Sequence, residues 1–228
     1  MDLRQHHHEP LPVLRRRLLI AGVVLFVLGV ALSVVVASSA VLQPLDDRFL
    51  RLMVSLRTTP AVDVGKVLNV AFGTAVLLPL RIVITVVLAV RRHWAALGAW
   101  LATLATSELL IGPLKALVDR PRPPGPLIAT SGASYPSGHA IASAVTAIGV
   151  VMALTSGRRR LHWMVAAVCL AALVALSRTY LSAHWLTDVV GGSLLGAGLA
   201  LGIPEGVEVW RDRRLSRRRP GPPPTAAS

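Results

Sequence analysis

A run of 25 residues without a single charge, residues 18–42, is the feature that most restricts how this chain folds. The hydrocarbon core of a bilayer is about 30 Å thick, and an α-helix needs roughly 20 apolar residues to cross it. The run is too long for the apolar region of a signal peptide. It therefore predicts a first transmembrane helix, which follows Arg15, Arg16 and Arg17.

Five further stretches have the composition of spanning helices, although the last three are short or rich in glycine. They cover residues 67–90, 93–114, 139–155, 163–176 and 189–203. With the first run they predict an all-α, polytopic membrane protein with six transmembrane helices in a helical bundle. We expect one membrane domain over residues 18–210, a cytoplasmic tail at 1–17, and a basic, then proline-rich cytoplasmic tail at 211–228.

The composition supports this fold class and narrows the chemistry. Apolar residues make up 54% of the 228 residues and charged residues only 15%, which is too little charge for the surface of a soluble domain. The single cysteine, Cys169, excludes an internal disulfide framework and a zinc site built from cysteines. Three adjacent histidines, His6, His7 and His8, lie in a polar terminus and are interpreted as a solvated tail rather than a metal site.

The net charge of +13 is mainly a signal of membrane orientation. Fifteen Lys and Arg residues lie in the terminal segments and the connections on their side of the membrane, and eight lie on the other side. The positive-inside rule therefore predicts that both termini are cytoplasmic. These cations favour anionic lipid headgroups as partners, and nucleic acid is not expected. Arginine outnumbers lysine 22 to 2, which suggests a GC-rich bacterial genome, so we expect a bacterial plasma membrane.

The segment 46–63, between the first two spans, mixes leucines with charged residues. Its apolar residues recur at helical spacing, which predicts an amphipathic helix on the outer membrane surface. A plain connecting helix packed on the bundle fits the same pattern equally well.

Two ionisable residues, Arg81 and Glu108, fall inside predicted spans. Charges in the bilayer interior are costly and are usually paired or functional. We expect these two to pair with each other and so to hold the second span against the third. The alternative is that Glu108 contacts Lys115, seven residues further on, or lines the substrate entry.

Three polar clusters lie at the predicted outer face, after the third span, before the fourth and after the fifth. Their members are Lys115, Arg120 and Arg122; Ser137, Gly138 and His139; and Arg178, His184 and Asp188. Taken singly, each has an ordinary structural explanation: a lysine that anchors a span at the interface, a serine that caps a helix, or a histidine–aspartate hydrogen bond. Their location on one face makes a single site the stronger interpretation.

The residue types in these clusters suit a phosphate group. Three cations around one point, Lys115, Arg122 and Arg178, hold several anionic oxygens, and a guanidinium matches phosphate in a bidentate way. Ser137 and Gly138 add a hydroxyl and closely approaching backbone N–H donors. The predicted ligand is therefore a phosphate.

The two histidines suit phosphoryl transfer. His184 and Asp188 are four residues apart and share a face if the segment is helical. A carboxylate bound to one ring nitrogen leaves the other free to attack phosphorus. His139 is then available to protonate the leaving alcohol oxygen.

The clusters resemble the three signatures of the type 2 phosphatidic acid phosphatase (PAP2) family, lipid phosphate phosphatases that share a core with vanadium haloperoxidases and bacterial acid phosphatases. The patterns K-x6-R-P, P-S-G-H and S-R-x5-H-x3-D match residues 115–123, 136–139 and 177–188 without substitution. The resemblance implies that His184 is the nucleophile, supported by Asp188, and that His139 is the general acid. It implies phosphate binding by Lys115, Arg122, Ser137, Gly138 and Arg178. It also implies that the reaction needs no metal and no other cofactor.

The expected function is metal-independent hydrolysis of a lipid phosphate or diphosphate at the outer membrane face, through a phosphohistidine intermediate. Phosphatidic acid, phosphatidylglycerol phosphate and undecaprenyl diphosphate are substrates in the resembling family, and the sequence does not choose among them. Arg120 falls outside the signature spacing and is assigned to the rim, where it offers a cation for a second phosphate.

Two other functions fit the same clusters. The first is a non-catalytic phospholipid carrier or scaffold that retains the phosphate pocket. The second is haloperoxidase-like oxidation with bound vanadate, which the membrane setting disfavours. The sequence leaves the oligomeric state open.

Overall fold

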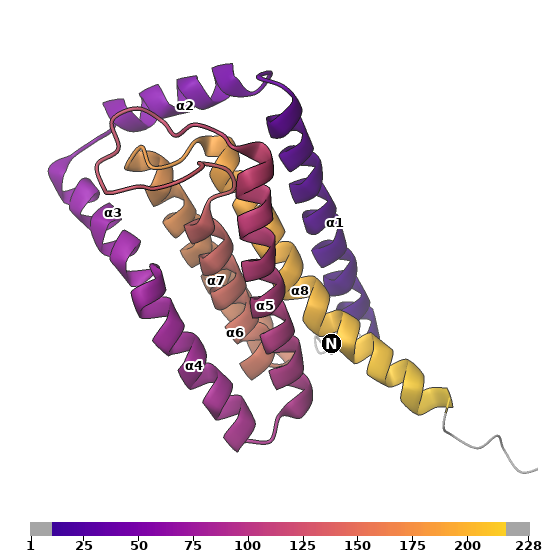
Figure 1. Cartoon of the computed structure of the whole chain (residues 1–228). Coiled ribbons are helices and arrows are strands. Elements are labelled where there is room, and N and C mark those ends of the chain that lie inside the picture. Colours follow the sequence, from indigo (N-terminus) through magenta and orange to yellow (C-terminus); the bar gives the residue numbers. More distant parts are fainter. Residues whose placement is uncertain (1–10, 218–228) are drawn as a thin grey trace, which may run out of the picture.

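The computed structural model describes residues 11–217, and over this range the chain consists of helices and the loops that join them. The described helices are α1 (Leu11–Ser38), α2 (Gln43–Ser55), α3 (Thr59–Ala71), α4 (Thr74–Val90), α5 (Trp94–Val118), α6 (Gly138–Leu154), α7 (Gly157–Tyr180) and α8 (Leu186–Arg217). In Figure 1, α5 to α8 stand together, α1 lies along α8, and α3 and α4 form the opposite side. α2 lies across one end of the bundle, while α1 begins and α8 ends at the other. The predicted all-α class is confirmed.

Several of these helices are able to cross a bilayer. Four stretches are long and apolar enough: Val13–Ser38, Trp94–Val118, Arg159–Tyr180 and Leu186–Arg214. α3 and α4 pass the same test together, as one span bent by 48°, and would make a fifth. α6 is apolar but has only 17 residues, or about 25 Å of helix. The chain is therefore a polytopic membrane protein, and six crossings stay a prediction.

The region from residue 43 to residue 90 differs from the sequence prediction. The sequence predicts one amphipathic helix over 46–63 and one span over 67–90, whereas the structure has three helices with breaks at 56–58 and 72–73. Pro60 lies in the first turn of α3, where its missing N–H group costs nothing. Gly73 is the extended N-cap residue of α4. The backbone preferences of proline and glycine therefore determine where α3 and α4 begin, and hydrophobic periodicity does not reveal these helix ends.

α2 has the contacts of a connecting helix, one of the two arrangements proposed for its segment, and its place on the membrane surface stays a prediction. Asp46 and Met53 are buried, and α2 contacts α7 and α8, so it packs on the bundle as a connecting helix. Leu45, Leu52 and Leu56 remain about half exposed, which leaves apolar surface beside the bundle end.

Helical structure extends past both limits of the predicted 18–210 domain. α1 begins at Leu11, and α8 continues to Arg217, so parts of the two predicted tails are helical. Arg15 of α1 forms an ion pair of 3.0 Å with Asp212 of α8 in these extensions. The predicted solvated histidines, residues 6–8, and the proline-rich stretch 220–228 lie outside the described residues.

Close backbone contact joins α1 to α8. A Cβ atom on Gly22 would lie 2.5 Å from the backbone nitrogen of Gly202, and one on Gly198 would lie 2.6 Å from the backbone nitrogen of Phe26. Membrane helices pack through such small residues because lipid tails supply no hydrophobic drive for association. The glycines therefore determine how closely the first and last helices approach.

Replacing Gly22 should separate these two helices. We expect Gly22→Ala to destabilise the protein by about 1–3 kcal/mol, because the new methyl group meets backbone atoms that cannot move aside. Thermal unfolding of the purified protein in detergent measures the effect. Gly112→Ala is the matched control, because no heavy atom lies within 4 Å of a Cβ placed there in α5. Equal melting temperatures for the two variants would contradict this packing.

Candidate active site

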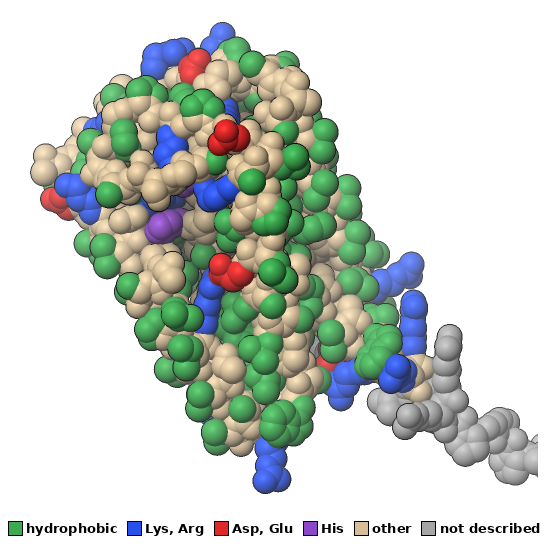
Figure 2. Space-filling model, in the orientation of Figure 1, with side chains coloured by type: hydrophobic (Ala, Val, Ile, Leu, Met, Phe, Trp, Pro, Cys, Tyr) green, Lys and Arg blue, Asp and Glu red, His purple; other side chains and the backbone are tan. Residues whose placement is uncertain are grey.

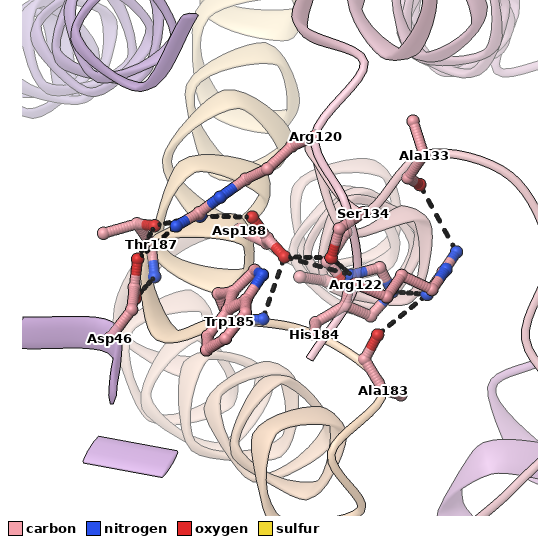
Figure 3. A network of polar contacts seen from close by, with 12 residues as sticks. Asp46, Arg120, Arg122, Ala133, Ser134, Ala183, His184, Trp185, Thr187 and Asp188 are labelled. Carbon is pink, nitrogen blue, oxygen red and sulfur yellow. Dashed lines mark hydrogen bonds and ion pairs between the residues drawn. The ribbon is translucent and has the colours of Figure 1, made fainter. Parts of the chain in front are cut away.

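The three polar clusters meet at the end of the bundle that α2 crosses. Lys115 comes from the end of α5, Ser137 to His139 from the start of α6, Arg178 from the end of α7, and Asp188 from the first turn of α8. The long loop between α5 and α6 adds Arg120, Arg122 and Ser134 (Figure 3). Helix ends and one loop thus assemble residues that lie far apart in the sequence.

The carboxylate of Asp188 lies at the centre of this polar network and is fully buried. Its Oδ2 accepts hydrogen bonds from the hydroxyl of Ser134 and, at 2.8 Å, from the backbone N–H of Trp185. The Nδ1 atom of His184 lies 3.5 Å from the same oxygen. This contact orients the ring so that the opposite nitrogen, Nε2, points away from Asp188, as the sequence predicts for a nucleophile.

Arg120 does not lie at the rim where the sequence analysis placed it. Its side chain is 10% exposed, and its two terminal nitrogens pair with Asp188 at 2.8 Å and with Asp46 at 2.6 Å. The guanidinium also lies over the ring of Trp185, with 5.4 Å to the ring centroid. Two buried carboxylates are stable only with a cation between them. This explains why Arg120 is buried in the site although it lies outside the signature pattern.

Asp46 connects α2 to this network. Its Oδ1 accepts a 2.9 Å hydrogen bond from the backbone N–H of Thr187, and its Oδ2 accepts one of 2.7 Å from the Thr187 hydroxyl. The order of contacts is therefore Asp46, Arg120, Asp188 and His184. Sequence analysis missed Asp46, because nothing in the pattern of α2 distinguishes this carboxylate from its exposed neighbours.

Arg122 lies directly beside His184. Its Nη1 atom is 3.3 Å from the Nε2 atom of His184 and donates a 2.8 Å hydrogen bond to the carbonyl of Ala183. Its other donors reach the carbonyls of Ser131 and Gly132. Burial lowers the pKa of Arg122 from its usual value. This placement brings a fixed, partly desolvated positive charge to the nitrogen that faces away from Asp188.

Arg178 is the cation with a spare donor. The residue is buried, its Nη1 donates to the side-chain oxygen of Asn69 in α3, and its buried Nε has no hydrogen-bond partner among the described residues. The backbone carbonyl of the same Asn69 lies 3.1 Å from Nε2 of His139. Asn69, which sequence analysis missed, thus positions both a predicted phosphate ligand and the predicted acid.

The remaining predicted phosphate ligands, all within the described residues, form no hydrogen bond with the side chains of His184 or Asp188; they are Lys115, Ser137 and Gly138. Lys115 donates a 2.5 Å hydrogen bond to the carbonyl of Ala133. Ser137 is buried and caps α6, where its hydroxyl accepts from the backbone N–H of Ala140 at 3.4 Å. Gly138 begins α6, and the free N–H groups at a helix N-terminus attract anions. The cap reading of Ser137 is thus confirmed, and a direct bond to phosphate stays a prediction.

Burial controls the protonation of His184. It lowers the pKa of this imidazole from its usual value, and the neighbouring Asp188 carboxylate opposes that shift only in part. His184 is therefore neutral at pH 7, the form in which a ring nitrogen can act as a nucleophile.

A groove of about 830 Å³ lies between α4, α5 and α6 and reaches the polar site. Its walls are mainly apolar, and Gly138 and His139 line it where α6 begins. Arg81 and Glu108 also line it and form the expected ion pair, with 2.9 Å between Nη1 and Oε1. Figure 2 shows this side of the molecule, where hydrophobic side chains surround a few charged groups and a histidine. The pairing is confirmed, and Glu108 also lines the groove; that this groove is the substrate entry stays a prediction.

Metal ligands do not gather at this site. Within residues 11–217, no three His, Cys, Asp or Glu side chains come close enough together to hold a metal ion.

Comparison with known proteins identifies a family and relatives of this chain. Residues 96–211 match the family model of the PAP2 superfamily. A phosphatidylglycerophosphatase B of Bacillus subtilis is 31% identical over 200 residues, which cover 83% of this chain and 97% of that protein. A decaprenylphosphoryl-5-phosphoribose phosphatase of Mycolicibacterium smegmatis is 39% identical over 107 residues, which cover 45% of this chain and 53% of the relative.

A solved structure shows the same arrangement of helices. The crystal structure of a transmembrane PAP2-type phosphatidylglycerolphosphate phosphatase from Bacillus subtilis superposes with a TM-score of 0.73 at 28% identity. The match covers 87% of this chain and 99% of that one. The likeness therefore includes the helices that carry the polar site.

The contact between Asp46 and Arg120 predicts a stability effect. We expect Asp46→Asn to destabilise the protein by about 3–5 kcal/mol, because it leaves a buried guanidinium without one of its two carboxylates. The melting temperature in detergent reports the loss. Asp63→Asn is the control, because its exposed ion pair with Lys66, at 3.8 Å, contributes about 1 kcal/mol or less. A melting temperature for Asp46→Asn as high as that of the control would show that the Arg120 contact is dispensable.

Proposed function

This chain belongs to the PAP2 superfamily, whose named relatives are lipid phosphatases, and we propose that it hydrolyses a lipid phosphate by way of a phosphohistidine on His184. One observation carries the proposal. The buried imidazole of His184 faces the Asp188 carboxylate with Nδ1 and the Arg122 guanidinium with Nε2. A neutral ring in this setting presents a nucleophilic nitrogen where positive charge collects phosphate oxygens.

In the first step Nε2 of His184 attacks the phosphorus atom of the substrate. The P–N bond forms as the P–O bond to the lipid breaks, and His139 gives a proton to the departing alcohol oxygen. Asp188 stabilises the positive charge that the His184 ring acquires, because its carboxylate lies 3.5 Å from Nδ1. The lipid alcohol leaves, and the phosphoryl group remains on His184.

In the second step water replaces the imidazole at phosphorus. His139 accepts a proton from the attacking water, the P–O bond forms, and the P–N bond breaks to release phosphate. His139 is thus returned to its starting protonation state and His184 to its neutral form. No redox change or metal ion enters either step.

Three cations and a helix N-terminus support recognition of the phosphoryl group. Arg122 and Arg178 supply guanidinium donors, Lys115 supplies an ammonium group, and the first N–H groups of α6 add partial positive charge. The spare Nε–H of Arg178 is a donor that a phosphate oxygen can accept. Charge that develops on the phosphoryl oxygens in the transition state is stabilised by these fixed groups.

The apolar groove supports a lipid as the substrate. It joins the polar site at His139 and continues between α4, α5 and α6. The hydrocarbon chain of a lipid can therefore lie in the groove while the phosphate of the same lipid lies among the cations of the polar site. Phosphatidic acid, phosphatidylglycerol phosphate and undecaprenyl diphosphate all have this form. Arg120 is committed to Asp46 and Asp188 and is not available for a second phosphate, which favours a monophosphate within this class.

The direction of the site follows from the charge distribution. The arginine-rich ends of α1 and α8 lie opposite the polar site, and the positive-inside rule assigns them to the cytoplasm. The polar site then faces outward, where it acts on lipids of the outer leaflet.

Phosphate release by the purified protein tests this function. The substrates are phosphatidic acid, phosphatidylglycerol phosphate and undecaprenyl diphosphate in detergent, each with EDTA present. We expect release to persist with the chelator and to fall roughly 10³-fold or more in His184→Ala, because the nucleophile is lost. His93→Ala, exposed at the opposite end of the bundle, should retain wild-type activity.

Three results would overturn parts of this proposal. Loss of activity with EDTA would contradict metal-independent chemistry, and full activity of His184→Ala would exclude this nucleophile. If the folded wild-type protein releases phosphate from none of the substrates, a carrier or scaffold that only binds the phosphate is favoured. Acid-labile, alkali-stable ³²P on wild-type protein but not on His184→Ala would identify the intermediate.

The protonation of His184 predicts the acidic limb of the pH profile. Only the neutral imidazole attacks phosphorus, and its pKa lies below the usual 6.5. We therefore expect kcat/KM, corrected for titration of the substrate phosphate, to persist below pH 6.5 and to fall only as the pH passes through the lowered pKa. Initial rates in detergent across the acidic range give this profile. A midpoint above pH 6.5 would contradict the assignment.

A further inference from the structure

A second polar pocket lies at the end of the bundle away from the candidate active site. It has a volume of about 220 Å³, roughly seven times the ~30 Å³ that a water molecule occupies in the liquid. It is lined by Arg15 at the start of α1, Thr155 after α6, Arg160 at the start of α7, and Glu205 and Glu208 late in α8. The active-site residues come from the opposite ends of α6, α7 and α8, so the two sites are distinct.

Glu205 is a buried acidic residue of this pocket, and one of its two carboxylate oxygens lacks a hydrogen-bond donor within the described part of the chain. Its side chain is 3% exposed, and its Oε1 accepts a 3.1 Å hydrogen bond from Nη1 of Arg160. Its Oε2 is also buried, but no group among the described residues donates to it. A buried carboxylate oxygen without a donor is costly, so this atom points to a ligand that supplies one.

Two neighbouring charges of the pocket, Arg160 and Glu208, have partners of their own. Arg160 also donates hydrogen bonds to the backbone carbonyls of Thr155 and Met152. Glu208 takes a 2.9 Å ion pair with Arg211. The missing partner of Glu205 is therefore a hydrogen-bond donor, and a cationic donor matches its negative charge better than a neutral one.

Arg15 adds a place for an anion beside this carboxylate. Its Nη1 pairs with Asp212 at 3.0 Å, and its Nη2 forms a longer ion pair with Glu208, at 3.7 Å, which leaves the N–H groups of Nη2 outside hydrogen-bond distance of that carboxylate. The Arg15 side chain is about one-third exposed and lines the pocket. The pocket thus offers an acceptor for a cation and, close by, a donor for an anion.

Three tryptophans place the pocket at the level of lipid headgroups. Trp94, Trp163 and Trp210 lie at this end of α5, α7 and α8 and are 64%, 59% and 52% exposed. Exposed tryptophans in membrane proteins gather at the bilayer interface, where the headgroups lie. A ligand with an ammonium group and a phosphate at this depth is a zwitterionic phospholipid.

We propose that this pocket binds the headgroup of an aminophospholipid, with its primary ammonium group on Oε2 of Glu205 and its phosphate at Arg15. The lipid comes from the leaflet at the arginine-rich end of the bundle, opposite the leaflet that supplies the candidate active site. Phosphatidylethanolamine has the required groups. Phosphatidylcholine lacks an N–H donor, and phosphatidylglycerol lacks the cation.

Lipid binding to the delipidated full-length protein tests the site. Affinities for short-chain phosphatidylethanolamine, phosphatidylcholine and phosphatidylglycerol are measured by native mass spectrometry and by the rise in melting temperature. We expect phosphatidylethanolamine to bind about tenfold more tightly than either of the others, the size of one hydrogen bond to a charged group. Glu205→Gln should abolish this preference, whereas Asp63→Asn, which changes an exposed carboxylate of α3 outside both pockets, should keep it.

A second variant keeps the test decisive if Glu205→Gln does not fold. Ala95 lines the pocket from α5, and Ala95→Leu fills it without removing a charge. We expect Ala95→Leu to weaken phosphatidylethanolamine binding about tenfold or more, by steric exclusion of the headgroup. Equal binding of the three lipids, or undiminished phosphatidylethanolamine binding by Ala95→Leu or by folded Glu205→Gln, would overturn the proposal. Neither outcome depends on phosphatase activity.

Discussion

The buried carboxylate of Asp188 is the group on which the rest of the polar site depends. A carboxylate with no exposure to solvent is tolerated only if donors surround it, and here Arg120, Ser134 and the backbone of Trp185 supply them. These donors come from the α5–α6 loop and from Trp185, the residue before α8. The need to satisfy one negative charge therefore fixes the loop, and through Arg120 and Asp46 it fixes α2 as well. His184 inherits its orientation from this arrangement.

The cations near Asp188 divide into two kinds according to what their donors contact. Both terminal nitrogens of Arg120 form ion pairs with carboxylates, so this residue stabilises the site but has few free N–H donors for a ligand. Arg178 keeps a buried nitrogen without a partner, and Arg122 lies against the nitrogen of His184 that faces away from Asp188. Free donors in a buried place are costly unless a ligand uses them. The same reasoning distinguishes Glu205, at the other end of the bundle, from the paired charges around it.

Sequence patterns identified most of the candidate site but not the residues that support it. The spacing of the three clusters brought Arg122, His139 and His184 into one hypothesis, and the structure places them at one end of the bundle. Asp46 and Asn69 escaped notice because their importance comes from contacts made 141 and 109 residues away along the chain. Arg120 was misplaced at the rim for the same reason, since its carboxylate partners are invisible in a local pattern.

The sequence by itself determined that this is an all-helical membrane protein with a cluster of cations and histidines, because hydropathy and charge act residue by residue and need no knowledge of neighbours in space. It also indicated the Arg81–Glu108 pair, since two opposite charges inside apolar spans have few other partners. Only the tertiary structure decided where α3 ends and α4 begins, which arginine keeps a donor unpaired among the described residues and which one supports Asp188, and that an apolar groove reaches His139. These features depend on how helix ends meet, and packing between distant segments, rather than local pattern, sets that geometry.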